Sequence, residues 1–223
     1  MKFALCNEVI RDMSFPAQCE YAAALGYDSL EVAPFTLSQT PHQPGSVDVA
    51  ATRRAAQDAG IEIASLHWLL VTPEGLSITD PDNTVRARTV EVMRRLIDLC
   101  GELGGKVLVH GSPAQRRLTL GDEGGARHRA LDCLAAVADA AQAAGVIYCI
   151  EALAPEDADF INRVGEAAAM VDIIKSPWVR SMLACCATAK LAEDSPAALI
   201  DRWLTSGHLA HVQVNDGNDR GPG

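Results

Sequence analysis

The sequence alternates between two kinds of segment along its whole length, and this alternation constrains the fold more than any other feature. Short apolar stretches rich in β-branched residues are separated by alanine-rich stretches with helical spacing. Strands are predicted over 2–8, 28–34, 61–69, 106–111, 146–153, 179–185 and 209–216. Helices are predicted over 14–26, 46–60, 83–104, 124–145, 163–175 and 195–207.

Glycine marks the ends of most predicted helices, at positions 26, 60, 104, 145 and 207. A helix commonly ends on a residue in the left-handed conformation, which glycine adopts without steric cost. Strand, helix, glycine and strand follow one another as in consecutive right-handed βαβ units. We therefore predict an α/β fold of the (β/α)8 TIM-barrel type as a single domain over 1–223, with the seven predicted strands present and the last strand missing.

A doubly wound open sheet is the competing architecture. Its usual mark is a G-x-G-x-x-G turn after the first strand, and the sequence has "CNEVIRD" there instead. The stretch "GELGGK" (101–106) leads into a strand rather than a helix, so we interpret it as a helix C-cap. The pattern therefore favours the barrel.

Charge and composition exclude several classes of function. The formal net charge of −10 argues against nucleic acid or an anionic membrane surface as a partner. The first apolar run ends at Asn7, unlike a signal peptide, and no apolar run is long enough to span a bilayer. The seven cysteines form no C-x-x-C pair, which is typical of reduced thiols. We expect a cytoplasmic protein.

Polar residues follow the predicted strands, and in a parallel barrel those strand ends surround one mouth. They are Asn7, Glu8, Glu31, His67, His110, Glu151, Gln213, Asn215 and Asp216. Glu151 is the most informative, because it ends an apolar run, and a buried unpaired carboxylate costs several kcal/mol. It therefore needs a cation, a hydrogen-bond network or a raised pKa. His67 and His110, taken singly, are also compatible with structural histidines.

Short motifs spread over the chain resemble one superfamily. They are "ALCNE", "LEVAPF", "ASLHWL", "VLVHGSPAQRR", "YCIEALAPEDADFIN" and "HVQVND". Together they resemble the xylose-isomerase-like TIM-barrel superfamily of sugar (phosphate) isomerases and epimerases, which includes ketose 3-epimerases and hydroxypyruvate isomerase.

The resemblance implies a divalent metal, Mn²⁺ or Mg²⁺. Glu151 matches the ligand that ends strand five, and Gln213 falls at the strand-seven ligand. Ala184 falls at the strand-six ligand and has no donor atom, and the strand-eight Glu has no counterpart. Either a C-terminal tail completes the barrel, or a neighbouring subunit covers the open edge. Asp219 falls where related sequences have an Arg.

The resemblance also implies a mechanism. A proton moves next to the carbonyl of an open-chain sugar through an enediolate, with the metal as Lewis acid. Glu151, His67 and His110 are the expected catalytic residues, and Asn7, Glu31, Asp157 and Asn215 the expected substrate-binding residues. The expected partner is a small sugar, and dimers or tetramers are common for this fold. The alternatives are an inactive barrel that binds a sugar-like ligand or a partner, and an endonuclease IV-like nuclease, which the negative charge disfavours.

Overall fold

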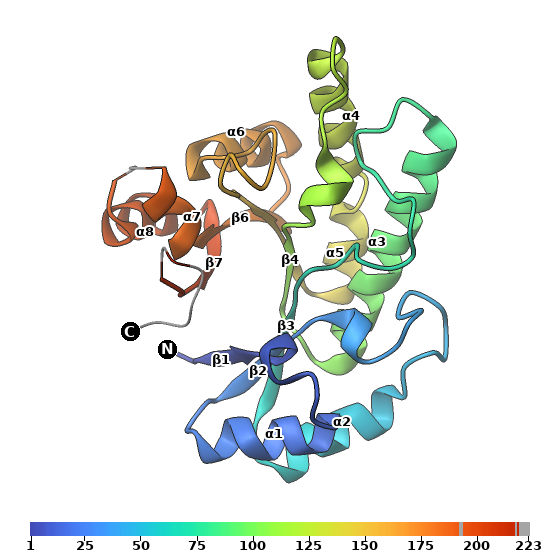
Figure 1. Cartoon of the computed structure of the whole chain (residues 1–223), viewed down its shortest axis with the longest axis vertical. Coiled ribbons are helices and arrows are strands. Elements are labelled where there is room, and N and C mark those ends of the chain that lie inside the picture. The colour runs from blue at the N-terminus through green and yellow to red at the C-terminus, as the bar shows by residue number, and fades with distance from the viewer. Residues whose placement is uncertain (192–193, 217, 219–223) are drawn as a thin grey trace.

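Seven parallel strands form one sheet that curls around a central axis, with the helices on its outer side (Figure 1). The computed structural model describes residues 1–191, 194–216 and 218. The strands are paired in chain order: β1 (Ala4–Cys6), β2 (Ser29–Val32), β3 (Glu62–Leu66), β4 (Val107–His110), β5 (Ile147–Glu151), β6 (Val179–Ala184) and β7 (Leu209–Gln213). The predicted seven-stranded α/β barrel is confirmed. Within the described residues no pairing joins β7 to β1, so the barrel is open on that side.

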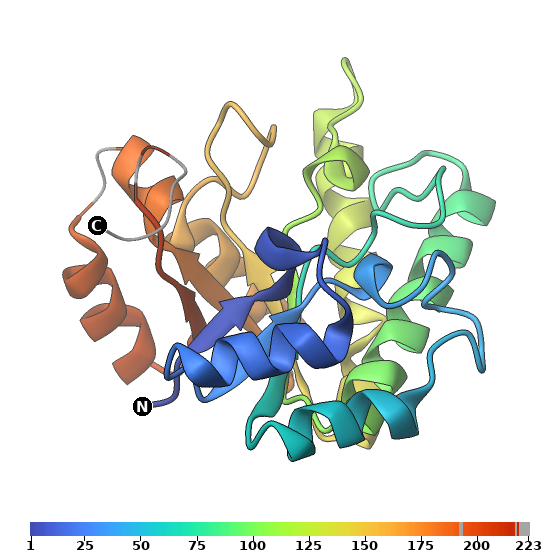
Figure 2. The same cartoon turned by 60° about the horizontal axis from the view of Figure 1, so that its bottom comes forward.

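The helices connect consecutive strands and cover the outer face of the sheet (Figure 2). They are α1 (Phe15–Ala24), α2 (Val49–Asp58), α3 (Asn83–Leu103), α4 (Glu123–Ala135), α5 (Ala138–Ala144), α6 (Val164–Ile174), α7 (Cys185–Lys190) and α8 (Pro196–Thr205), with 3-10 turns η1 (Asn7–Ile10), η2 (Pro34–Thr36) and η3 (Pro113–Arg116). None of the described helices is both long enough and apolar enough to cross a membrane.

Local sequence signals fix where these helices begin and end. The carboxylate of Asp82 accepts a hydrogen bond from the backbone N–H of Thr84 at 2.7 Å, which caps the start of α3. Gly104 ends the same helix with φ of 89°, the left-handed conformation. The other glycines predicted to end helices also have positive φ: Gly26, Gly60, Gly145 and Gly207.

Two helix predictions need correction. The segment 124–145 is two helices, because the chain turns at Ala136 and Val137, and Arg94 of α3 donates a hydrogen bond to the carbonyl of Ala136 at 3.0 Å. The short helix α7 was not predicted, and it begins directly after the last residue of β6.

Side chains on the strands alternate between two apolar layers. Leu108, Tyr148 and Ile150 belong to the large core between the sheet and the helices. Val109 directly follows Leu108, and Cys149 lies between Tyr148 and Ile150. Both belong to a small cluster inside the curled sheet. Successive residues of a strand point to opposite faces, so this pattern decides which strand-end residues face the interior.

Candidate active site

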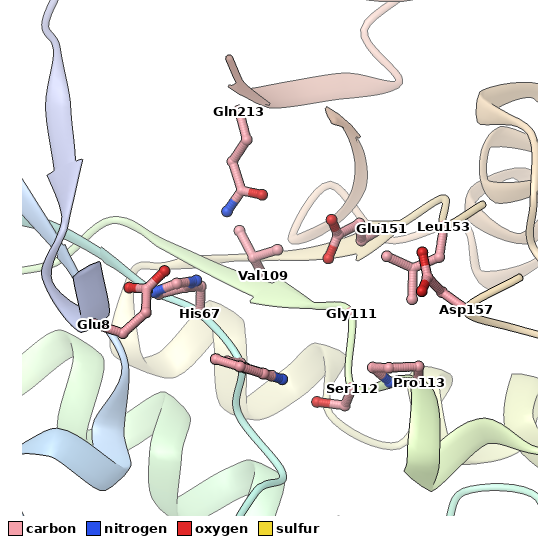
Figure 3. A pocket seen from close by; sticks show the side chains of 11 residues that line it. Glu8, His67, Val109, Gly111, Ser112, Pro113, Glu151, Leu153, Asp157 and Gln213 are labelled. Carbon is pink, nitrogen blue, oxygen red and sulfur yellow. The ribbon is translucent and has the colours of Figure 1, made fainter. Parts of the chain in front are cut away.

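A pocket of about 260 Å³ opens at the carboxyl ends of the strands (Figure 3). Its wall combines ionisable side chains with apolar ones, and it draws residues from β4, β5, β7 and the segments that follow β1, β3, β4 and β5. The lining residues are Glu8, His67, Trp68, Val109, Gly111, Ser112, Pro113, Glu151, Leu153, Asp157 and Gln213.

Glu151 is the last residue of β5, and its side chain lines the pocket. It shares the interior face with Cys149, two residues earlier in the strand. One carboxylate oxygen lies against Gly111, where a Cβ atom would overlap it. Burial raises the pKa of Glu151 to about 7, although the nearby charge of Arg116 opposes this shift. The carboxyl group can therefore both accept and donate a proton near neutral pH.

Arg116 supports Glu151 from behind the pocket. It lies in η3 and is fully buried, and its Nη1 donates a hydrogen bond to the backbone carbonyl of Glu151 at 2.7 Å. Burial lowers the pKa of Arg116 to about 10. Arg116 lies in the motif "VLVHGSPAQRR", but an arginine after a strand gives no sequence signal that it will be buried.

Glu8 and His67 form an ion pair on the opposite wall of the pocket from Glu151 (Figure 3). His67 Nε2 and Glu8 Oε2 are 2.8 Å apart. Burial alone would lower the pKa of His67, but the hydrogen bond to Glu8 and the charges of Glu31 and Glu8 raise it overall. The next residue, Trp68, has a positive φ of 52°, and its ring packs edge-on against Phe35. This conformation turns the indole toward the pocket.

Glu31 links the first strands of the barrel to the last one. It ends up almost completely buried in β2, where its carboxylate accepts a hydrogen bond from Gln213 Nε2 at 3.2 Å and lies 3.3 Å from His211 Nε2. Burial alone would raise the pKa of Glu31, but the contacts with His211, His67 and Gln213 lower it to about 2. Glu31 is therefore a carboxylate bridging β2 and β7.

Cys6, Glu8 and His67 form a group of metal-ligating side chains. Each offers one ligand atom, and these atoms all lie within 4.8 Å of one another. Cys6 Sγ also donates a hydrogen bond to Glu31 Oε2 at 3.5 Å.

The structure brings some of the expected site residues into the pocket and leaves others outside it. Glu151, His67, Asp157 and Gln213 line the pocket, and Glu31 contacts Gln213. His110 does not line it: its ring is buried on the outer face of the sheet, where Nδ1 lies 2.6 Å from the hydroxyl of Tyr148. Burial lowers the pKa of His110 to about 3. The period-two alternation of β4 explains this, because Val109 and Gly111 take the interior face.

The two expected asparagines hold loops rather than line the pocket. Asn7 is fully buried; its Nδ2 donates to Gln18 and Thr36, and its Oδ1 accepts from the backbone N–H of Ala33 at 2.8 Å. Asn215 Oδ1 accepts from the backbone N–H of Cys186 at 3.1 Å, which connects the end of β7 to α7. Asp219 lies outside the described residues.

The fold is that of one class of protein. The sequence profile of the family described as "Xylose isomerase-like TIM barrel" matches residues 19–222. The chain therefore belongs to the xylose isomerase-like TIM-barrel family.

Several of the similar proteins are sugar epimerases. The D-psicose 3-epimerase of Ruminiclostridium cellulolyticum is 28% identical over 207 residues, which are 92% of this chain and 67% of the relative. A crystal structure of D-psicose 3-epimerase in the presence of D-fructose has a TM-score of 0.81 at 22% identity, covering 100% of this chain and 76% of that chain. The 3-keto-D-glucoside 4-epimerase from E. coli has a TM-score of 0.80 at 17% identity, with 98% and 80% covered.

Proposed function

We propose that this chain is an isomerase or epimerase of small open-chain sugars or sugar phosphates, which moves a proton next to the substrate carbonyl through an enediolate. The observation that carries the proposal is the Glu151 carboxyl group, which faces the pocket with a pKa of about 7. A group with a pKa near the working pH is the most effective general base and acid. The named relatives are epimerases of D-psicose and of a 3-keto-D-glucoside, so ketoses are the first substrates to test.

The other pocket residues have separate roles in this proposal. Glu151 takes the proton from the carbon next to the carbonyl, and the raised pKa of His67 favours a cation that stabilises the negative oxygen of the enediolate. Asp157 accepts hydrogen bonds from sugar hydroxyls. His110 is a positioning residue here, because its contact with Tyr148 joins β4 to β5 behind Glu151.

Only some of the metal ligands that the family resemblance implies are present in this chain. Glu151 and Gln213 supply oxygen atoms, and Figure 3 shows both side chains directed into the same pocket. Ala184 ends β6 and supplies no donor. Mn²⁺ and Mg²⁺ prefer six oxygen ligands, so these two residues would hold such an ion only with water or substrate at its other positions, and we derive no step of the reaction through one.

Exchange of substrate hydrogen with solvent tests the proposal. A panel of ketopentoses and ketohexoses is incubated with the protein in D₂O, and deuterium in the recovered sugars is measured by mass spectrometry. At least one ketose should gain deuterium, and Glu151→Gln should slow this exchange by about 100-fold or more, because the amide cannot accept the proton.

Glu156→Gln is the matched control. Glu156 lies in the same loop as Asp157, is mostly exposed and forms an ion pair with Lys190 at 2.8 Å, so this variant should exchange like the parent. No exchange with any ketose would contradict the proposal and favour a barrel that binds a sugar without turning it over. If Glu151→Gln exchanged substrate hydrogen as fast as the parent, Glu151 would not be the group that transfers the proton.

A further inference from the structure

Among the described residues, a group of metal-donor side chains lies on the β1–β3 side of the barrel and shares no residue with the position that the family resemblance implies. Cys6 is the last residue of β1, Glu8 lies in η1, and His67 follows β3. Their ligand atoms lie within 4.8 Å of one another, and the Glu8 and His67 atoms are 2.8 Å apart. Ligands of a tetrahedral Zn²⁺ ion lie roughly 3 to 4 Å apart, because its bonds are about 2.0 to 2.3 Å long. Small side-chain movements would therefore place all three around one ion.

Three carboxylates lie in and next to this group. Glu31 is 2% exposed and contacts Cys6, while Glu8 and Glu151 line the adjoining pocket. Among the described residues, the basic side chains in contact with these carboxylates are His67 and His211, and the charge of Arg116 also acts on Glu151. A cation bound between the three carboxylates would be stabilised by their negative charge.

The types of donor select the metal. A thiolate and an imidazole are softer ligands than the oxygens that Mg²⁺ and Mn²⁺ prefer, and with one carboxylate they match Zn²⁺ or Co²⁺. Three protein ligands leave the fourth tetrahedral position for water or substrate. Because Glu8 and His67 line the pocket, that fourth position would face it.

We propose that Cys6, Glu8 and His67 bind one thiophilic divalent cation, Zn²⁺ or Co²⁺, with an open coordination position toward the pocket. Cys6 Sγ, a Glu8 carboxylate oxygen and His67 Nε2 form the three bonds, and the Cys6 thiol proton and the proton that His67 Nε2 shares with Glu8 leave to solvent. The cation would face Glu151 across the pocket (Figure 3), where it would take the place of a protonated His67 and could polarise the carbonyl of a bound sugar. The proposed cation site is argued from its three ligand atoms alone. Its role in polarising a sugar carbonyl rests on the proposed function.

Cobalt titration tests the site directly. Chelator-treated protein is titrated with Co²⁺, and the near-ultraviolet thiolate-to-cobalt charge-transfer absorption is followed. One equivalent of Co²⁺ should produce the band, and Zn²⁺ should remove it by displacement. Cys6→Ser should lose the band, and Glu8→Gln should weaken Co²⁺ binding at least 10-fold. Cys185→Ser is the matched control, because Cys185 is partly exposed and lies at the start of α7, outside the group.

A second measurement uses the unchanged chain, so that the test does not depend on how a variant folds. Zn²⁺ should slow alkylation of Cys6 by iodoacetamide, measured by peptide mass spectrometry, and leave alkylation of Cys185 unchanged. A missing cobalt band, a band that persists in Cys6→Ser, or unchanged alkylation of Cys6 would overturn the proposal. So would Co²⁺ binding that depends on Glu151 and Gln213 but not on Cys6.

The outcomes separate this proposal from the proposed function. Deuterium exchange into a ketose without a cobalt band would reject the cation site and keep the sugar chemistry. A cobalt band that depends on Cys6, without exchange into any ketose, would keep the site and reject the chemistry.

Discussion

At the scale of single residues, the close approach between Gly111 and Glu151 is the most sensitive feature of the pocket. The Glu151 carboxylate occupies the space that a Cβ atom on Gly111 would fill. Glycine at position 111 therefore sets where the proposed catalytic carboxylate lies. An added methyl group would displace the carboxylate rather than the backbone, because the side-chain end is the part that can move.

Gly111→Ala should slow substrate exchange by about 100-fold, because a displacement of about 1 Å has an effect of that size on positioned catalytic groups. Gly124→Ala is the control: no atom lies near its added Cβ, and it lies in the first turn of α4. The control should keep its exchange rate and gain up to about 1 kcal/mol in free energy of unfolding. Unchanged exchange in Gly111→Ala would show that the carboxylate position is not critical.

At the scale of secondary-structure elements, the contact of Glu31 with His211 and Gln213 replaces backbone pairing that the open side of the barrel lacks. Glu31 lies in β2, and its partners lie in β7, at the opposite edge of the sheet from β1. The described residues contain no backbone pairing between β7 and β1. The side-chain contact therefore fixes β7 relative to the first strands.

Glu31→Gln should lower the free energy of unfolding by about 3 kcal/mol at pH 6, because it removes the buried carboxylate that His211 and Gln213 contact. Hydrogen exchange of the β7 amides, followed by mass spectrometry, should be faster than in the parent. Glu62→Gln is the control, since Glu62 pairs with Lys2 on the exposed surface, where such pairs contribute about 0 to 1 kcal/mol. Faster hydrogen exchange confined to β2, with the β7 amides unaffected, would contradict the bridging role.

At the scale of the whole molecule, buried titratable groups determine how stability depends on pH. The pKa of Glu31 is lowered from 4.5 to about 2, so its stabilisation is present above pH 4.5 and is lost as the pH falls toward 2. The pKa of His110 is lowered from 6.5 to about 3, so its contribution falls as the pH falls from 6.5 to 3. The pKa of Glu151 is raised from 4.5 to about 7, so its contribution changes in the opposite direction between pH 7 and pH 4.5.

The free energy of unfolding should therefore change little between pH 7 and pH 4.5, where His110 and Glu151 oppose each other, and fall steeply below pH 4.5. Urea unfolding followed by circular dichroism over a pH series measures this. In Glu31→Gln the slope below pH 4.5 should be shallower than in the parent. If the free energy of unfolding of the parent changed equally steeply with pH above and below pH 4.5, the role given to Glu31 would be contradicted.

The sequence by itself determined the order of strands and helices, the ends of most helices and the strand that ends on Glu151. These are local properties, because hydrophobic period, capping residues and glycine conformation depend on near neighbours in the chain. The pattern also predicted that Glu151 and Gln213 face one region, since parallel strands of a barrel bring their carboxyl ends together.

Only the tertiary structure decided which strand-end residues reach the pocket. His110 and Glu151 both end strands, yet one points to the outer core and the other to the interior, because a shift of one residue in a strand reverses the face. The burial of Arg116 and the meeting of Cys6, Glu8 and His67 join residues far apart in the chain. Such contacts depend on how the sheet curls, and no local pattern in the sequence encodes them.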